Sequence, residues 1–307
     1  MILGGDLGGT KTLLALAEVI DGRPRIVRRQ RFASGDYASF DDLLGEFLAG
    51  SPAIATACFG VAGPTDGRQA KLTYLPWQLA AVALESRFGI GRVALLNDFA
   101  AAAHGLPLLA PAQVATLHAG HPLDAAPRVV LGAGTGLGVA GLVWHEGRHR
   151  VIPGEGGHIG FAPQTPQQGE LWRWLLDRQG RVTTEDVVSG PGLARIHAFL
   201  GGQPQAPDAI GAAALAGDTL AAPALRLWLE CYGAFAGDLA LHWLARGGVY
   251  LAGGIAARLL PHVDCTPLVD AFLAKREHRP LVEDMPLRLA VTEDLGLAGT
   301  LACAAAP

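Results

Sequence analysis

A glycine-rich stretch near the start of the chain, GGDLGGTKT over residues 4–12, carries a carboxylate in its middle. Glycine loops of this kind usually bind phosphate through backbone N–H groups, and a bare carboxylate at Asp6 would repel that phosphate. Only Lys11 is near enough in the sequence to offset the charge. Either the stretch is a structural turn, or a cation lies between Asp6 and the phosphate.

Two common phosphate-binding motifs do not match the glycine loops of this chain. A P-loop needs a lysine directly after its last glycine and a helix next, whereas Thr10 separates Gly9 from Lys11 and a strand pattern follows. A second glycine loop, LGAGTGLG over residues 131–138, has Leu137 where the dinucleotide-binding fingerprint requires its third glycine. The remaining functional interpretation is a strand–turn–strand phosphate loop as in actin-like ATPases, where the aspartate acts through Mg²⁺ or its waters.

The segment HEGRH, residues 145–149, matches the H-E-x-x-H pattern of zinc proteases. That pattern works because a helix places both histidines on one face. Here Gly147 lies in the middle of the segment, between two apparent strands. We therefore interpret it as a hairpin turn and reject a zinc protease.

Three polar segments could bind a ligand rich in hydroxyl groups. In LLNDFA, residues 95–100, the two polar side chains could cap a helix or could accept a hydroxyl proton at the end of a strand. PGEGGHIGFAP, residues 153–163, holds an acid and a histidine among glycines, and another acid precedes VVSGPGL. The mixed donors and acceptors that a sugar requires would come from Asn97, Asp98, Glu155, His158 and Glu185.

Hydrophobic periodicity predicts strands and helices in both halves of the chain. The first half is predicted to contain strands at residues 2–6, 12–20, after a turn at 21–24, near 54–60 and at 92–96. Its helices are predicted after Ser39, where Asp42 completes a capping box, and near 78–88. From Arg128 the strand–glycine turn–strand pattern recurs, which indicates a duplicated fold, followed by helices at 169–179, 191–200 and 218–245, a strand and loop at 248–260, and a final strand and helix.

The bulk composition excludes several classes of protein. A chain of 307 residues with 17% charged residues is expected to fold into two domains or one large α/β unit. Its net charge of −4 argues against nucleic-acid binding, and we find neither a signal peptide nor an apolar run of about 18 residues. The cysteines, Cys58, Cys231, Cys265 and Cys303, are scattered singly, which favours reduced thiols in a cytosol over a disulfide framework.

Six motifs, taken in order, resemble the bacterial glucokinase family within the hexokinase and actin-like ATPase group. They are GGDLGGTKT, LLNDFA, GAGTGLGVA, PGEGGHIGFAP, EDVVSGPGL and LAGGIAAR. The resemblance implies two ribonuclease-H-like α/β domains that flank a cleft: residues 1–108, completed by a C-terminal helix at about 294–307, and residues 109–293. It also implies ATP-dependent phosphorylation of D-glucose at the 6-hydroxyl, with Mg²⁺, by a cytoplasmic homodimer.

The resemblance also implies a role for each matched residue. Asp98 is the expected general base, and the expected sugar-binding residues are Asn97, Asp98, Glu155, His158 and Glu185. Asp6 is expected to hold Mg²⁺, through water, while the N–H groups of Gly8 to Thr10 face the phosphate. The expected ATP- and phosphate-binding residues are Asp6, Gly8, Gly9, Thr10, Lys11, Gly134, Thr135, Gly136, Gly253 and Gly254.

Some positions depart from the family pattern. Lys11 stands where these glucokinases commonly have asparagine; a lysine there is familiar from the related ROK sugar kinases, whose cysteine-rich zinc motif this chain lacks. Tyr74 stands where relatives often carry asparagine, which bears on sugar selectivity. A kinase for another hexose or an amino sugar, and a non-catalytic sugar sensor on the same fold, therefore remain alternatives.

Overall fold

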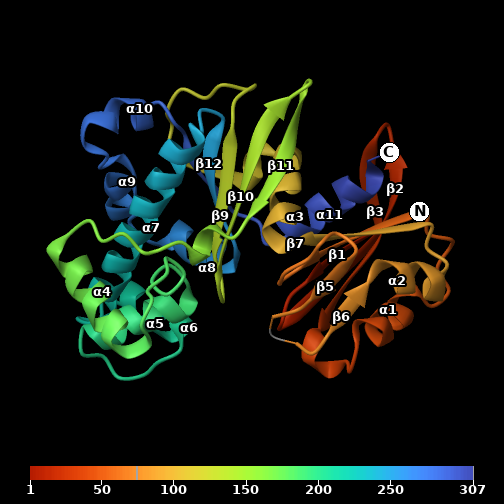
Figure 1. Cartoon of the computed structure of the whole chain (residues 1–307), viewed down its shortest axis with the longest axis horizontal. Coiled ribbons are helices and arrows are strands. Elements are labelled where there is room, and N and C mark those ends of the chain that lie inside the picture. The colour runs from red at the N-terminus through yellow and green to blue at the C-terminus, as the bar shows by residue number, and fades with distance from the viewer. Residues whose placement is uncertain (74, 307) are drawn as a thin grey trace. The chain divides into compact units, whose positions relative to one another are not determined.

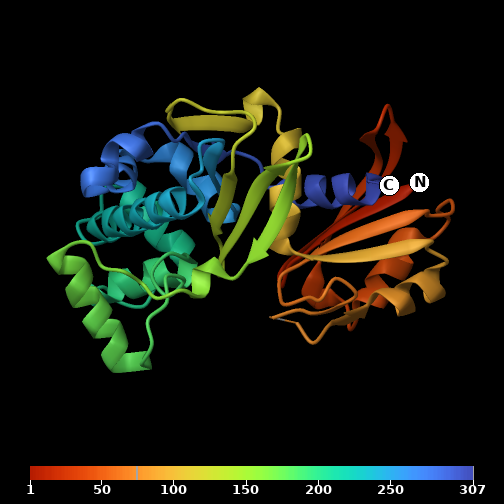
Figure 2. The same ribbon diagram turned by 45° about the horizontal axis from the view of Figure 1, so that its top comes forward.

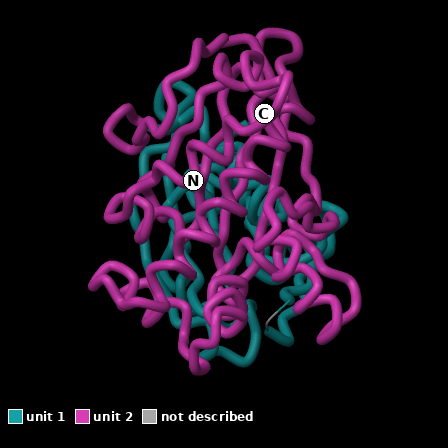
Figure 3. Tube along the Cα trace, turned by 90° about the vertical axis from the view of Figure 1, so that its left-hand side faces the viewer, with its two compact units in different colours: residues 1–109, 294–307 teal, residues 110–293 magenta. Residues whose placement is uncertain are grey.

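The computed structural model describes residues 1–73 and 75–306, so the sugar-selectivity prediction made for Tyr74 falls outside the described residues. The chain divides into two compact units, residues 1–109 with 294–307 and residues 110–293 (Figure 3). Each unit has its own β-sheet and its own hydrophobic core. We describe each unit by itself.

The first unit is built on a five-stranded sheet with the order β3-β2-β1-β4-β7 (Figure 1). β1, β2 and β3 are antiparallel neighbours, whereas β4 pairs parallel to β1 and β7 pairs parallel to β4. The glycine turn joins β1 to β2, as predicted. The bounds are β1 Ile2–Leu7, β2 Lys11–Ile20, β3 Arg23–Ala33, β4 Thr56–Val61 and β7 Arg92–Asn97.

Helices cover both faces of this sheet (Figure 2). On one face lie α1 (Phe40–Leu48) and α2 (Ala81–Phe88), and the Ser39 side chain caps α1 by accepting the Asp42 N–H, as the capping-box pattern predicted. On the other face lies the C-terminal helix α11 (Leu295–Ala305), which also packs against α3 (Asp98–Gly105).

One prediction for this unit was wrong in part. The helix expected from residue 78 begins at Ala81, because Gln78–Ala80 form strand β6, which pairs with β5 (Gln69–Lys71). Leu79 is buried between two exposed neighbours, which is the two-residue period of a strand. An alternation over only three residues is too short to be recognised in a sequence.

The second unit repeats the strand order of the first. Its sheet has the order β11-β10-β9-β12-β13-β8: β9, β10 and β11 are antiparallel neighbours, while β12 pairs parallel to β9 and β13 parallel to β12. The duplication predicted from the glycine turns is therefore confirmed, with an added edge strand, β8. The bounds are β8 Val114–His118, β9 Arg128–Ala133, β10 Leu137–His145, β11 Arg148–Gly154, β12 Gly248–Ala252 and β13 Leu287–Ala290.

The segment that resembles a zinc-protease motif is the turn between β10 and β11. Glu146 (φ 49°) and Gly147 (φ 79°) both have the left-handed backbone typical of a two-residue hairpin turn. His145 ends one strand and His149 lies in the next, where its Nε2 is 3.0 Å from the Ala126 carbonyl oxygen. The two histidines are thus not on one helical face, and the prediction of a hairpin turn is confirmed.

The core of the second unit surrounds a long helix, α7, whose Trp228 and Tyr232 are fully buried. The predicted helices at 169–179, 191–200 and 218–245 correspond to α4, α5 and α7. Four shorter helices were not predicted. The bounds are α4 Pro166–Gln179, α5 Gly190–Phe199, α6 Pro207–Leu215, α7 Ala221–Trp243, α8 Gly254–Leu259, α9 Thr266–Leu273 and α10 Arg279–Glu283.

Helix α11 approaches α3 so closely that glycine is required between them. A Cβ at Gly299 would lie 1.7 Å from the Ala101 carbonyl oxygen, and one at Gly105 would lie 2.4 Å from the Leu295 carbonyl oxygen. Both contacts are with backbone, which cannot rotate away. The two glycines therefore allow the C-terminal helix to pack against the helix that begins at Asp98.

Gly299→Ala is expected to force α11 away from α3 and to lower the free energy of unfolding by about 2–3 kcal/mol, a typical cost of overpacking. Gly169→Ala in α4 is a matched control, because a Cβ there meets nothing within 4 Å. The control should raise stability by about 0.5–1 kcal/mol through helix propensity. Chemical denaturation measures both variants, and an equally stable Gly299→Ala would contradict the close packing.

Candidate active site

The polar residues of the first unit lie at one edge of its sheet. Strands β1, β4 and β7 are parallel, so their carboxyl ends meet at that edge, with Leu7 opposite Val61 and Val61 opposite Asn97. Adjacent strands are about 4.8 Å apart, which places Leu7 and Asn97 about 10 Å from each other across the sheet. The first glycine turn and the start of α3 therefore open on the same side.

The first glycine turn is held by hydrogen bonds from within the unit. The Gly8 N–H donates to the Lys11 carbonyl oxygen at 3.0 Å and closes the turn. The buried Ser34 donates its hydroxyl to the Gly8 carbonyl oxygen at 2.8 Å and its N–H to the Thr10 carbonyl oxygen at 3.1 Å. The expectation that the Gly8 N–H faces phosphate is thus wrong in this conformation, because the turn itself uses that donor.

Asp6 carries a perturbed carboxyl group. Burial raises its pKa to about 6; the charge of Lys11 lowers the pKa, and that of Asp294 raises it. Gly296, in the first turn of α11, gives the carboxylate room, since a Cβ there would lie 3.0 Å from Asp6 Oδ2. The ionised form of Asp6 is therefore costly in this environment, and a cation beside it would offset that cost.

Asn97 and Asp98 lie where β7 gives way to α3. Asn97 Oδ1 accepts the N–H groups of Phe99 at 2.9 Å and Ala100 at 3.3 Å, so the helix-cap interpretation is confirmed for this side chain. Asp98 Oδ1 accepts the Phe99 N–H at 2.8 Å, and its side chain is partly exposed. A carboxylate in the first turn of a helix is stabilised by the free N–H groups there.

The glycine segments of the second unit also meet at one sheet edge. Ala252 pairs with Gly132, so the loops that follow β9 and β12 are neighbours. The Gly134 N–H donates to the Gly136 carbonyl oxygen at 2.8 Å. Gly253, at φ 87°, lies close to the end of β9, and a Cβ at this position would be 2.9 Å from the Ala133 carbonyl oxygen.

Three of the predicted sugar-binding side chains come together in the second unit. His158 Nδ1 is 3.5 Å from Glu155 Oε2, and His158 Nε2 is 3.9 Å from Glu185 Oε1. The backbone supports this contact, because the Glu185 N–H donates to the Gly157 carbonyl oxygen at 2.9 Å. The side chains of Glu155 and His158 are well exposed, at 69% and 60%, so they can reach a ligand. We call these three residues the acid–histidine cluster.

Glu185 connects this cluster to the second glycine turn. Its Oε2 accepts the Leu137 N–H at 2.8 Å, at the end of that turn. A Cβ at Gly136 would lie 2.6 Å from the same oxygen, so Gly136 leaves space for the carboxylate. Sequence spacing gave no signal of this contact, since the two segments are far apart in the chain. Ser34, Asp294 and Gly296 of the first unit were missed for the same reason.

The residues described here do not include a cluster of three or more histidine, cysteine, aspartate or glutamate side chains that could hold a metal ion. Mg²⁺ does not need such a cluster, because it is commonly bound through one or two carboxylates, retained waters and the phosphates of a nucleotide. The half-buried carboxylate of Asp6, beside a glycine turn, fits that mode of binding. No helix within the described ranges is long and apolar enough to cross a membrane.

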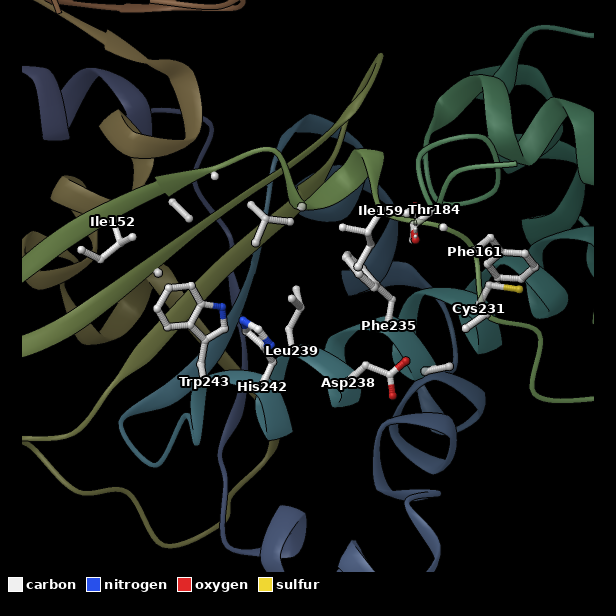
Figure 4. Close-up of a pocket in the computed structure, with 18 residues that line it drawn as sticks. Ile152, Ile159, Phe161, Thr184, Cys231, Phe235, Asp238, Leu239, His242 and Trp243 are labelled. Atoms are coloured by element: carbon white, nitrogen blue, oxygen red, sulfur yellow. Dashed lines mark hydrogen bonds between the residues drawn. The ribbon is translucent and has the colours of Figure 1, made fainter. Parts of the chain in front are cut away.

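A pocket of about 310 Å³ in the second unit has a different chemistry (Figure 4). It lies between α7 and strands β10 and β11 and is lined mainly by apolar side chains such as Ile152, Phe235 and Trp243. Its wall includes Ile159 and Thr184, which flank the acid–histidine cluster in sequence, but none of the three residues of that cluster lines it. An apolar pocket of this kind cannot satisfy the hydroxyl groups of a sugar.

Comparisons with known proteins agree with one another along the whole chain. A model of the glucokinase family matches residues 3–307. The glucokinase of Nostoc punctiforme is 36% identical over 337 residues, covering 99% of each chain. The crystal structure of a glucokinase from an Antarctic psychrotroph superposes with a TM-score of 0.87 at 29% identity, covering 99% of this chain and 98% of that one. A ROK family glucokinase from Streptomyces griseus, solved with glucose and AMPPNP, has the same fold (TM-score 0.63, 22% identity, 99% and 98% covered).

Asp6→Asn is expected to stabilise the metal-free protein in a pH-dependent way. The folded-state pKa of about 6 lies above the ordinary value of 3.8, so the wild type loses stability as the pH rises from about 4 to 6. The free energy of unfolding of the variant should equal that of the wild type near pH 4 and exceed it at pH 7.5, by at most about 3 kcal/mol for a pKa raised from 3.8 to about 6.

Denaturant unfolding in EDTA at several pH values measures this difference. Asp264→Asn is the control, because hydrogen bonds from Thr266 lower the pKa of Asp264. That variant should lose stability relative to the wild type as the pH rises toward the ordinary pKa of 3.8, and the difference should stay constant at higher pH. If the difference in unfolding free energy between Asp6→Asn and wild type does not change with pH, burial does not raise the pKa of Asp6.

Proposed function

Because the chain belongs to the glucokinase family, we propose that it transfers the γ-phosphoryl group of ATP to the 6-hydroxyl of D-glucose. The observation that carries this proposal is the position of Glu185, whose carboxylate contacts both His158 and the second glycine turn. One oxygen thus belongs to a cluster suited to hydroxyl groups and the other to a turn suited to phosphate. Phosphoryl transfer requires both kinds of site and little covalent chemistry from the protein.

Asp98 is proposed as the general base that accepts the proton of the 6-hydroxyl. Its place at the first residue of α3, directly after β7 ends, supports this role, because the side chain lies at the carboxyl edge of the parallel strands and is partly exposed. Asn97 caps the same helix through Oδ1, which directs its amide NH₂ group away from the cap. That NH₂ group is proposed to donate a hydrogen bond to the sugar.

The acid–histidine cluster is proposed to bind the other hydroxyl groups of glucose. Carboxylates of Glu155 and Glu185 can each accept hydroxyl protons, and His158 can donate or accept. A site built from charged hydrogen-bonding groups rejects molecules that lack the matching hydroxyls, because its own polar groups would then lose their partners.

The glycine segments are proposed to bind Mg²⁺ and ATP. In the first turn the N–H groups of Gly9 and Thr10 would receive phosphate, and Lys11 would add a point charge. The second turn would contribute Gly134, Thr135 and Gly136, and Gly253 and Gly254 would lie beside the adenosine. Asp6 would hold Mg²⁺ through water, and the ion would neutralise phosphate charge. On the family resemblance we also propose a cytoplasmic homodimer.

Turnover measurements test the proposed reaction and its base. The wild type should phosphorylate glucose in preference to mannose, fructose and N-acetylglucosamine, and Asp98→Asn should lower kcat by about 10²- to 10⁴-fold. Asp21→Asn makes the same chemical change in an exposed turn and should leave kcat unaltered. If none of these sugars is turned over, the kinase proposal fails. A near-normal kcat for Asp98→Asn would show that Asp98 is not the general base.

Alanine variants of the two glutamates should separate sugar binding from nucleotide binding. Glu155→Ala should raise the KM for glucose about tenfold or more, the cost of a lost charged hydrogen bond, with little change in the KM for ATP. Glu185→Ala should raise both values, because Glu185 also holds the second glycine turn. Steady-state kinetics with each substrate varied in turn would show the contrast. A Glu185→Ala variant with a raised KM for glucose and an unchanged KM for ATP would argue against a role of Glu185 in both sites.

A further inference from the structure

Two cysteines that are far apart in the sequence meet beneath the C-terminal helix. Cys58 lies in β4 and Cys303 in α11, and Cys303 packs against the apolar cluster that contains Cys58. Both belong to the apolar cluster that joins α11 to the sheet, which also contains Leu297 and Leu301. The pair is therefore held in place by the packing of the first unit.

A hydrogen bond beside the two cysteines also holds α11 on β4. The Thr56 hydroxyl donates to the Ala304 carbonyl oxygen at 2.5 Å, two residues before Cys58 on the same strand and one residue after Cys303 on the helix. Residues i and i+2 of a strand share a face, so Thr56 and Cys58 both face α11. Helix and strand are thus joined next to the thiols, which keeps Cys303 packed over the strand that carries Cys58.

We propose that Cys303 and Cys58 form an oxidant-reactive dithiol that takes a hydroperoxide and closes to an intramolecular disulfide. Cys303 is the attacking thiol, since it is partly exposed, whereas Cys58 is fully buried. Cys58 is the resolving thiol. All four cysteines carry free thiols in this structure, so the site is described in its reduced state.

The chemistry is balanced with the hydroperoxide as the oxidant. The Cys303 thiolate attacks one peroxide oxygen, the O–O bond breaks, and sulfur gives up two electrons to form a sulfenic acid, while the alkoxide leaves and takes a proton. The Cys58 sulfur then attacks the Cys303 sulfur, the S–O bond breaks, and the hydroxyl leaves as water with the Cys58 proton. A thiol reductant then reduces the disulfide back to two thiols.

The charges around the two cysteines also favour Cys303 as the attacking thiol. The hydrogen bond from Cys58 lowers the pKa of the Cys303 thiol, burial raises it, and the charge of Arg92 lowers it further. Arg92 begins β7 and lies opposite Thr56 in the parallel register, next to the thiol pair. A partly exposed thiol near a cation is the environment typical of reactive cysteines.

Cys265 provides a matched comparison within the same chain. It is also partly exposed, but burial raises the pKa of its thiol. At pH 7 the thiolate of Cys303 should be much more populated, although a lower pKa also reduces nucleophilicity. We expect Cys303 to react with hydrogen peroxide at least about fivefold faster than Cys265.

Peptide mass spectrometry of the full chain after brief treatment with hydrogen peroxide tests the proposal. The wild type and the control Cys265→Ser should both yield a peptide pair linked through Cys58 and Cys303, which dithiothreitol separates. Cys303→Ser should yield no linked pair, and Cys58→Ala should accumulate a sulfenic acid at Cys303 that dimedone traps. Should Cys58→Ala fail to fold, the other three proteins still decide the question.

Oxidation of Cys265 while Cys58 and Cys303 stay unlinked would overturn the proposal, as would loss of the link in Cys265→Ser. The link should also raise the thermal unfolding midpoint, by roughly 5 °C or more, because it closes a very long loop of chain. The rise should vanish on reduction and be absent from Cys303→Ser. An unchanged or lower midpoint in the oxidised wild type would overturn the conclusion that the bond ties α11 to β4.

Discussion

Parallel strand pairing is the constraint on which both halves of the chemistry depend. In the first unit, β1, β4 and β7 end at one edge, and that edge carries the first glycine turn together with Asn97 and Asp98. In the second unit, β9 and β12 end at one edge, and that edge carries both glycine segments. A slip of one residue in these pairings would turn every side chain of a strand to the opposite face of the sheet. The register of the parallel strands thus decides which residues lie at the functional edge of each sheet.

Local patterns were sufficient to predict much of this arrangement. The glycine turns, the capping box at Ser39 and the hairpin at Gly147 each depend on a few neighbouring residues, so sequence alone indicates them. Glu155 and His158 were predicted together because one short segment holds both, and their side chains are neighbours in the structure. These features share a small separation along the chain, which is why their geometry could be read without a structure.

Features that join distant segments could not be predicted in this way. Ser34 supports the first glycine turn from the far end of β3, and the Asp294 side chain pairs with Arg29 at 2.7 Å across the first unit. The contact of Cys58 with Cys303 likewise requires the C-terminal helix to pack on β4. Single serines, aspartates and cysteines are common at ordinary positions, so nothing in their types distinguishes them. Only tertiary packing makes these residues partners.

Glu185 couples two parts of the second unit, the acid–histidine cluster and the second glycine turn. One carboxylate oxygen accepts the Leu137 N–H at the end of the glycine turn, and the other faces His158. A carboxylate is rigid and planar, so a shift of the turn that moves one oxygen must also move the other. Gly136 permits this arrangement, because any side chain there would displace the carboxylate from the turn. The same carboxylate therefore gives the acid–histidine cluster and the second glycine turn a direct mechanical connection.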